Sequence, residues 1–355
     1  MWECIWRTRL PASNACWIAG CTFPKTGPTI PRAEKNYVPE AVSFRTKPQI
    51  ALELIDRSLA AGVRVKAWTF DEFYGRDGAF LDGLEARHQV FVGEVPVHSH
   101  VWLQKPKILR LGPKRCRPTK YPRAGRRRPS SEVRNLLKYS PVFRQQAWQR
   151  YRIKDTNKGP EVWEVKWTVC WRKQAHGLPG RRHCLIVARN VLTGELKYFL
   201  ANRVPGEPGV TLRWLLRVAF GRWSVESCFR EAKEELGMDH YEVRGWRCVH
   251  RHFYVTQLSH LFCARVRQEY DASTGQPSER LTVEQVRSAM NVWLSTADLR
   301  PSVRQQRYQQ ELERQEYYQR RNSQARKSHT KTRVRQLCDR GIDVHRIKSC
   351  VAKCE

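Results

Sequence analysis

The sequence has few acidic residues for its length. Only 34 Asp and Glu stand against 65 Lys and Arg in 355 residues, which gives a formal net charge of +31. A chain with this imbalance needs a polyanion as its partner, and nucleic acid is the first candidate. A basic ribosome-associated protein and a membrane-surface protein are the alternatives. The length indicates two or more domains with a sizeable core.

Long apolar runs are also lacking. No stretch approaches the ~18 residues that a transmembrane helix needs. The N-terminus, M-W-E-C-I-W-R, does not have the charge-then-apolar order of a signal peptide. Both absences predict a cytoplasmic protein with no membrane partner, which would work at the nucleoid in a bacterial host.

The twelve cysteines contain no C-x-x-C pair. The closest pairs, Cys16 with Cys21 and Cys350 with Cys354, have neither a matching second pair nor paired histidines at zinc spacing. Disulfides are not expected in a reducing cytosol. Most of the cysteines are therefore interpreted as small apolar residues.

The most informative stretch is a predicted helix over 222–236. It contains no Pro or Gly, is rich in good helix formers, and meets a stop signal at Gly237. At about 100° per residue, Arg222, Glu226 and Lys233 fall on one face, so that two cations flank one carboxylate. An exposed helix with a charged face is the plain interpretation of this pattern.

The same pattern resembles a catalytic signature. Arg, then Glu four residues later and Lys seven residues after that, is similar to the signature that carries the last catalytic acid in the DDE-type transposases of bacterial insertion sequences. Three neighbouring segments resemble that family too, namely R-W-S-V-E, K-E-E-L-G-M-D-H-Y-E-V-R and R-H-F-Y-V-T-Q-L-S-H-L-F. The family signature usually has a Tyr three residues before the Arg, where this chain has Ala219. The resemblance covers most of the chain from Asn36 onward.

A second candidate acid follows a short predicted strand over 63–70. Asp71 lies at its carboxyl end, where open α/β sheets place their ligands, whereas a turn-forming Asp is the alternative. The segment D-E-F-Y-G-R-D-G resembles the sequence around the family's second catalytic Asp. Glu72 and Asp77 are close enough to compete for this role. Asp71 is preferred because it is nearest the strand end, and Asp77 suits the cap of a predicted helix over 79–87.

The resemblance implies an α/β fold of the RNase H-like kind. In it Asp71 and Glu226 would bind Mg²⁺, with Mn²⁺ as the alternative ion, because hard cations take carboxylate oxygens. Two such ions can serve both the attacking and the leaving oxygen of a phosphodiester. Arg222 and Lys233 would hold DNA phosphates or order the Glu. The implied partners are double-stranded DNA, as terminal inverted repeats and target, and a second copy of the chain in a synaptic homodimer.

The family's first catalytic Asp has no counterpart here. The acids before Asp71 do not match its motif; they are Glu3, Glu34, Glu40, Glu53 and Asp56. Residues 1–35 hold three Trp and three Cys without a sustained period or a motif, which a shifted reading frame or a wrongly chosen start would explain. We therefore expect a transposase that is truncated at its N-terminus and impaired in catalysis.

Two segments are strongly basic. Residues 105–128 hold eleven Lys or Arg and no acid, which predicts an arm along DNA phosphates or a solvated linker. Residues 301–355 hold 14 Lys or Arg against 6 acids and predict a helical tail that is solvated or contacts DNA. The candidate phosphate contacts in these segments are Arg126, Arg127, Arg128, Arg326, Lys327 and Lys331.

The other segments predict ordinary core elements. Residues 163–171 alternate Trp or Val with mostly polar residues, which predicts a half-buried strand whose aromatic face is core or, alternatively, a base-stacking platform. Residues 192–194 read L-T-G between two apolar runs and predict a hairpin. Helices are predicted over 48–61 and 251–266, and residues 211–220 are expected to return the chain to the catalytic fold. The apolar residues expected to face the core in the second helix are Leu258, Leu261 and Phe262.

The predicted organisation is an interrupted catalytic fold. It runs as an unassigned stretch (1–35), the first part of the RNase H-like fold (36–96), the basic arm with a β-rich insertion (97–205), the second part of the fold (206–270) and the basic tail (271–355). Three functional interpretations follow. They are a DDE transposase, a non-catalytic DNA-binding remnant or regulator, and a relic that does not fold stably because missing strands expose sheet edges.

Overall fold

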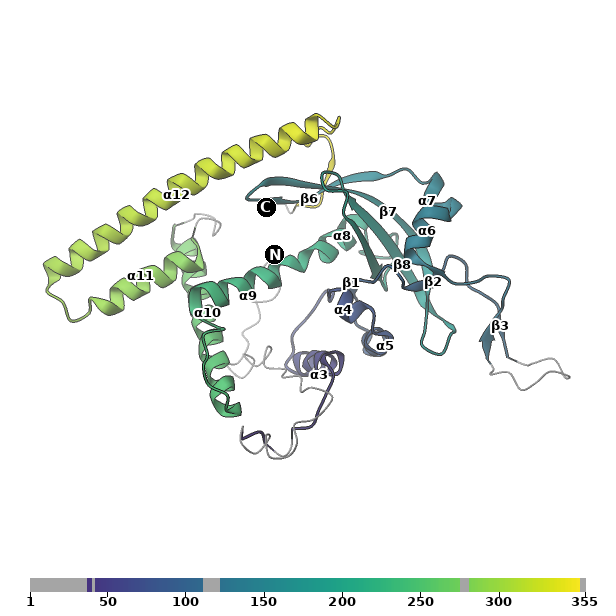
Figure 1. The fold of residues 1–355 in the computed structure, drawn as a ribbon, viewed down its shortest axis with the longest axis horizontal. Helices are drawn as coiled ribbons and strands as arrows, with labels where there is room; N and C mark the ends of the chain where they lie inside the picture. Colours follow the sequence, from purple (N-terminus) through teal and green to yellow (C-terminus); the bar gives the residue numbers. More distant parts are fainter. Residues whose placement is uncertain (1–36, 40–41, 111–121, 275–280, 352–355) are drawn as a thin grey trace. The chain divides into compact units, whose positions relative to one another are not determined.

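The computed structural model describes residues 37–39, 42–110, 122–274 and 281–351 (Figure 1). The unassigned stretch 1–35 and the middle of the basic arm lie outside the described residues. The chain divides into two compact units. The sheet unit consists of Arg64–Arg222 and Arg326–Glu355, and the helical unit consists of Met1–Val63 and Trp223–Ala325.

The sheet unit is a mixed α/β structure in which eight of the described strands form one sheet. These strands are β1 Val92–Glu94, β2 His100–Trp102, β5 Ser131–Glu132, β6 Gln149–Thr156, β7 Gly159–Lys173, β8 Pro179–Asn190, β9 Leu196–Ala201 and β10 Lys348–Ser349. Their order is β1-β9-β8-β7-β2-β5, with β6 beside β7 and β10 beside β6. The pairs are antiparallel except for β10 with β6. A separate hairpin joins β3 Ile108–Leu109 to β4 Arg123–Ala124, at the two ends of the basic arm.

The long strand β7 lies inside the sheet and pairs with three other strands. It pairs with β8 along one edge, and with β6 and then β2 along the other. Its Trp face is core: Trp163 is 2% exposed and packs on Phe220 with ring centroids 4.9 Å apart. The prediction of a half-buried strand is wrong, because the opposite face is covered as well. There Lys166 is buried against the carbonyl of Phe143, a residue of α7, and lies 4.8 Å from the ring of Trp148.

The helix α8, Leu212–Gly221, covers the Trp face of the sheet. Leu215 and Leu216 are fully buried in the cluster that contains Trp163 and Ile186. The hydroxyl of Thr211 caps the helix by accepting from the backbone N–H of Trp214 at 3.1 Å. The other helices of the sheet unit are α4 Glu72–Gly75, α5 Gly78–Ala86, α6 Val133–Tyr139 and α7 Pro141–Gln145.

The predicted strand over 63–70 is reduced to its last residues. Trp68 forms a parallel bridge with Phe91, the residue before β1. The N–H of Trp68 donates to the carbonyl of Val90 at 2.8 Å, and the N–H of Glu94 donates to the carbonyl of Phe70 at 3.0 Å. The preceding residues carry no strand assignment and alternate between exposed and half-buried positions. The extended segment nevertheless brings the chain to Asp71 in parallel register with β1.

The predicted basic tail is not uniformly solvated. A single helix, α12, runs from Pro301 to Cys338 and crosses from the helical unit into the sheet unit. Beyond it, Leu337, Ile342 and Val344 are buried in a cluster with Val162 of β7. The final strand β10 then pairs with β6. The last part of this tail is therefore built into the sheet unit.

The helical unit contains α3 Lys47–Ala60, α9 Trp223–Leu236, α10 Trp246–Thr274, α11 Val283–Ser295 and most of α12. Helices α9, α10 and α11 contact one another. Their shared core contains Cys263, Val283 and Val286, with Leu236 partly buried against them. No helix in the described residues is both long enough and apolar enough to cross a membrane.

One face of α10 was predicted wrongly. Leu258 is 51% exposed and Phe262 is 47% exposed, although both were expected in the core. The buried residues of this helix are instead Thr256, His260 and Cys263. The helix itself was predicted, although it extends beyond 251–266 at both ends, and its contacts with α9 and α11 select a more polar face for burial.

Candidate active-site carboxylates and basic surface

Asp71 lies where the parallel extended segment of the sheet unit ends. Phe70 immediately before it is 7% exposed and packs edge-on against Phe80, with ring centroids 5.2 Å apart. The chain then leaves the sheet, and Asp71 becomes the N-cap of α4. Its Oδ1 accepts a hydrogen bond from the backbone N–H of Tyr74 at 3.3 Å. The hydrophobic anchor at Phe70 thus fixes the base of a half-buried carboxylate.

The competing acids have different surroundings. Asp77 caps α5, as predicted, by accepting from the N–H of Phe80 at 3.0 Å. Glu72 is exposed in the first turn of α4. Because Asp71 and Asp77 are both helix caps, capping alone does not separate them. The feature that distinguishes Asp71 is its position at the end of the extended segment.

Two glycines near Asp71 were missed by the sequence analysis. A Cβ on Gly75 would lie 1.9 Å from the carbonyl oxygen of Glu94, and a Cβ on Gly93 would lie 1.8 Å from the ring of Phe70. Both positions therefore require glycine for close approach of α4, β1 and Phe70. The available signal was a glycine inside the short apolar run V-F-V-G-E-V, since glycine within a strand marks such an approach.

The side chain of Tyr74 is the titratable neighbour of Asp71. Burial raises the pKa of the Tyr74 hydroxyl above its ordinary value, and the negative charge of Asp71 raises it further. Tyr74 therefore stays neutral at physiological pH and retains its hydroxyl proton as a donor.

Glu226 lies on the helical unit, in the first turn of α9. The helix ends at Leu236 as predicted, and Gly237 follows it with a left-handed φ of +66°. Glu226 and Lys233 are both exposed on α9. Arg222 has helical φ and ψ at the end of α8 and is the last residue of that segment of the sheet unit. Asp71 and Glu226 thus belong to different units.

The described residues contain no ready-made metal cluster. No three His, Cys, Asp or Glu side chains among them are arranged to hold a metal ion. Asp71 offers an oxygen that suits Mg²⁺, because its Oδ2 makes no hydrogen bond within the part of the chain that the structure describes, and the Oδ2 of Asp77 is in the same state. One carboxylate oxygen is a fitting ligand but only part of a site.

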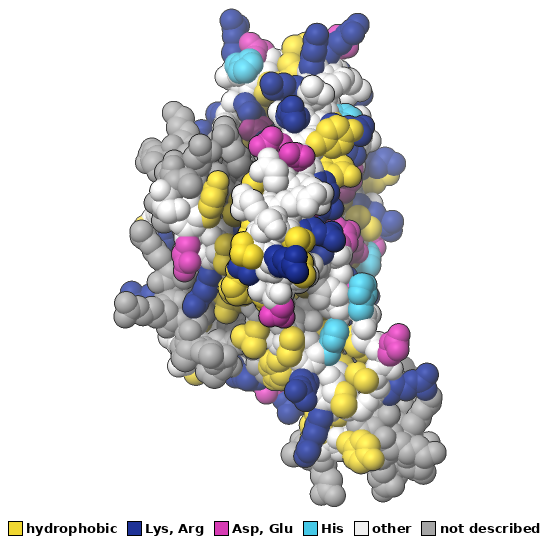
Figure 2. Space-filling view, turned by 90° about the vertical axis from the view of Figure 1, so that its left-hand side faces the viewer, with side chains coloured by type: hydrophobic (Ala, Val, Ile, Leu, Met, Phe, Trp, Pro, Cys, Tyr) yellow, Lys and Arg dark blue, Asp and Glu magenta, His cyan; other side chains and the backbone are white. Residues whose placement is uncertain are grey.

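The predicted phosphate contacts are at the surface. Arg126, Arg127 and Arg128 are exposed after β4, and Arg326, Lys327 and Lys331 are exposed on α12. Figure 2 shows Lys and Arg side chains spread over the face in view, with hydrophobic side chains between them. The chain therefore presents cationic side chains from several elements.

A buried polar cluster of the helical unit was also missed. His260 of α10 is 6% exposed. Its Nε2 lies 3.9 Å from the Sγ of Cys228 and 3.6 Å from the Oε2 of Glu231, both on α9. These partners raise the pKa of His260 to about 9, the Cys228 contact contributing most. Of this cluster, Cys228 and Glu231 lie on the same helix as Glu226, two and five residues after it.

Comparison with known families supports the nuclease-like reading of the first half of the chain. Residues 7–160 match the family model described as DDE superfamily endonuclease. The match includes Asp71 and β1, begins within the stretch that carries no recognised motif, and ends before Glu226. No curated protein matches the chain. The matched region supports a DDE transposase-type family.

Proposed function

We propose that this protein is a DDE-type transposase of an insertion sequence, which cleaves DNA at element ends and joins them to target DNA. The observation that carries the proposal is the position of Asp71. It follows an extended segment parallel to β1, inside the region that matches DDE superfamily endonucleases. In the proposed RNase H-like fold, this place belongs to the second catalytic Asp.

The proposed roles follow from the chemistry of the side chains. Asp71 and Glu226 supply carboxylate oxygens for Mg²⁺, with Mn²⁺ as the alternative ion. Two bound metal ions would polarise the attacking hydroxyl and stabilise the leaving oxygen of the phosphodiester. Arg222 and Lys233 contact the DNA backbone or order Glu226 through charge-assisted hydrogen bonds.

Catalysis by this chain is proposed to be impaired. Of the acids that precede Asp71, Glu53 and Asp56 lie on the helix α3, and Glu53 is paired with Arg45. The other three lie outside the described residues. Neither described acid can therefore act as a strand-borne partner of Asp71, and metal binding by two carboxylates is expected to be weak.

Nicking of a supercoiled plasmid tests these roles without knowledge of the element ends. In the presence of Mg²⁺ or Mn²⁺, we expect slow nicking that is lost in Asp71→Asn and in Glu226→Gln. Asp71→Asn keeps an oxygen that can cap α4, so the loss would not come from a missing cap. The matched controls are Asp77→Asn, another N-cap of the sheet unit, and Glu234→Gln, another exposed acid of α9. Nicking that survives both test substitutions would overturn the assignment.

The second candidate is a non-catalytic DNA-binding protein. The observation in its favour is the net charge of +31 together with exposed Lys and Arg side chains on α12. Such a protein would occupy terminal inverted repeats or join an intact transposase in a mixed dimer at the nucleoid. Tight DNA binding by the wild-type chain, with no metal-dependent nicking at all, would favour this candidate.

A further inference from the structure

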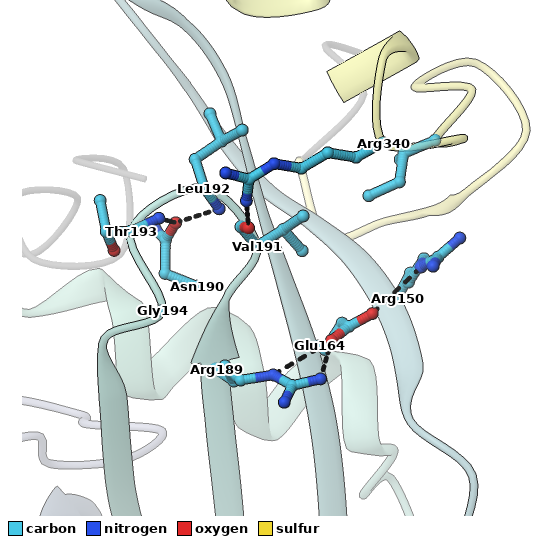
Figure 3. Close-up of a pocket in the computed structure, with 10 residues that line it drawn as sticks. Arg150, Glu164, Arg189, Asn190, Val191, Leu192, Thr193, Gly194 and Arg340 are labelled. Atoms are coloured by element: carbon cyan, nitrogen blue, oxygen red, sulfur yellow. Dashed lines mark hydrogen bonds and ion pairs between the residues drawn. The ribbon is translucent and has the colours of Figure 1, made fainter. Parts of the chain in front are cut away.

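A hollow of about 470 Å³ lies on the sheet unit at the end of β8. It is bounded by side chains of β6, β7 and β8, by the turn 190–194 and by the segment after α12 (Figure 3). Three arginines from three separate parts of the chain line it, namely Arg150, Arg189 and Arg340. The only acid in its lining is Glu164.

Glu164 orients two of the arginines but leaves some of their donors unused. It stands between them because β7 pairs Glu164 with Arg150 of β6 and with Arg189 of β8. Arg150 donates through Nε to Oε1 at 3.2 Å, and Arg189 donates through Nη2 and Nε to Oε2 at 2.6 and 3.2 Å. Within the described residues, both Nη groups of Arg150 and Nη1 of Arg189 donate no hydrogen bond.

The carboxylate of Glu164 remains charged in this setting. Burial alone would raise its pKa, but the hydrogen bonds from Arg189 and Arg150 lower the pKa below the ordinary value. The lining therefore carries three positive charges and one negative charge. A purely structural ion pair needs one cation for each carboxylate, so this cluster has an excess of two.

The rim of the hollow is a rigid turn with further donors. The Oδ1 of Asn190 accepts from the N–H groups of Leu192 and Thr193 at 2.9 and 3.0 Å, which fixes the turn. Gly194 completes it with a φ of +75°. Asn190 and Thr193 line the hollow, and neither the amide Nδ2 of Asn190 nor the hydroxyl of Thr193 donates a hydrogen bond within the described part of the chain.

Arg340 closes the hollow from the segment after α12. Its Nη1 donates to the carbonyl of Val191, which places the guanidinium over the turn (Figure 3). Ile342, two residues later, is buried against β7 and anchors this segment. The third arginine, which lines the hollow, is therefore held in place by a backbone contact and by the burial of the segment that carries it.

We propose that this hollow is a binding site for a phosphate group. Planar guanidinium groups donate paired hydrogen bonds that match phosphate oxygens, and a fixed arrangement of three lowers the entropy lost on binding. The phosphate is carried either by the backbone of a nucleic acid or by a free phosphorylated small molecule. The site contains neither Asp71 nor Glu226, so phosphate binding there does not depend on the proposed cleavage activity.

Titration calorimetry of the full chain with inorganic phosphate, at constant ionic strength, tests the site. We expect saturable binding by the wild type and a loss of affinity of about tenfold for each of Arg150→Gln and Arg340→Gln, as is usual for one charge-assisted contact. The matched control is Arg346→Gln, which removes an exposed arginine of the same segment that is paired with Asp343 at 3.2 Å and does not line the hollow.

Glu164→Gln separates a ligand site from a structural ion-pair cluster. Removing the single negative charge should tighten phosphate binding several-fold while lowering the melting temperature. If this variant does not fold, the phosphate affinities of Arg340→Gln and Arg346→Gln still decide whether the hollow binds phosphate. Absence of saturable phosphate binding by the wild type, or equal affinities of those two variants, would overturn the proposal.

A duplex DNA probe then identifies the carrier of the phosphate. If the carrier is nucleic acid, Arg340→Gln should make the slope of log affinity against log salt shallower by about one relative to Arg346→Gln. If the two slopes agree while phosphate affinity differs, the carrier is a free phosphorylated molecule. Both results support the site.

Discussion

His260 shows how one residue can make stability depend on pH. It is buried on α10 between the thiol of Cys228 and the carboxylate of Glu231, both of which belong to α9. The protonated ring is favoured, so its pKa rises from the ordinary 6.5 to about 9. A pKa raised by folding stabilises the protein fully below 6.5, and this contribution is lost as the pH passes through about 9.

We therefore expect the free energy of unfolding to fall by on the order of 2 kcal/mol between pH 6.5 and 9.5 because of this residue. Urea denaturation at a series of pH values measures the effect. In His260→Gln the decline over this range should flatten, and in Glu231→Gln it should become smaller. An unchanged decline in His260→Gln would show that other groups cause it.

At the scale of elements, α12 differs from the strands of the sheet. It is 38 residues long, and Leu337 near its end is its one buried residue among those described. In contrast, β7 and β8 pair over most of their length, and both contribute to the core of the sheet unit. Helical hydrogen bonds that lack tertiary cover open locally with little cost.

Hydrogen exchange should reveal this difference. We expect amides in the middle of α12 to exchange within seconds, whereas those of β7 and β8 exchange only through opening of the sheet unit. Mass spectrometry of peptic peptides measures both segments in one sample. Protection of the middle of α12 equal to that of β7 would mean that another surface covers the helix.

The elements also show how far sequence reasoning reached. Helices α3, α5 and α9 were predicted within one or two residues, and the turn between β8 and β9 was placed correctly, because caps, glycine stops and local periodicity determine them. Their packing was harder to predict. Leu258 and Lys166 were each assigned to the wrong environment, since burial depends on what the fold places against a face. The arginine-lined hollow joins residues 150 and 340, a separation that no local pattern encodes.

The candidate site was predictable to a similar degree. Asp71 could be selected because strand ends and caps have local signals, and the structure describes it at such an end. Gly75 and Gly93 were not selected, because their need for close approach arises only when α4 and Phe70 meet β1. The catalytic pairing of Asp71 with Glu226 stays a prediction.

For the whole molecule, the excess of positive charge governs association with DNA. Each phosphate neutralised releases counterions, so affinity for duplex DNA should fall steeply as salt rises. We expect the triple variant Arg326→Gln, Lys327→Gln, Lys331→Gln to make the slope of log affinity against log salt shallower by about three. Fluorescence anisotropy with a labelled duplex at several salt concentrations measures this slope.

A control with the same change in net charge is available. Arg134, Arg152 and Arg346 are each paired with a carboxylate, at 2.7, 2.6 and 3.2 Å, so their replacement by Gln should alter the slope much less. Equal slopes for the two triple variants would mean that only total charge matters and that α12 does not contact DNA.

The sheet unit is assembled from two stretches separated by about a hundred residues of helical unit, and this has a consequence for its synthesis. The partner of β6 and the residues packed on Val162 are translated after everything else that the structure describes. The edge of β6 that pairs with β10 therefore stays unpaired until Lys348 and Ser349 have left the ribosome. A nascent chain of this protein is therefore exposed to misassembly at this edge while about the second half of the sequence is translated.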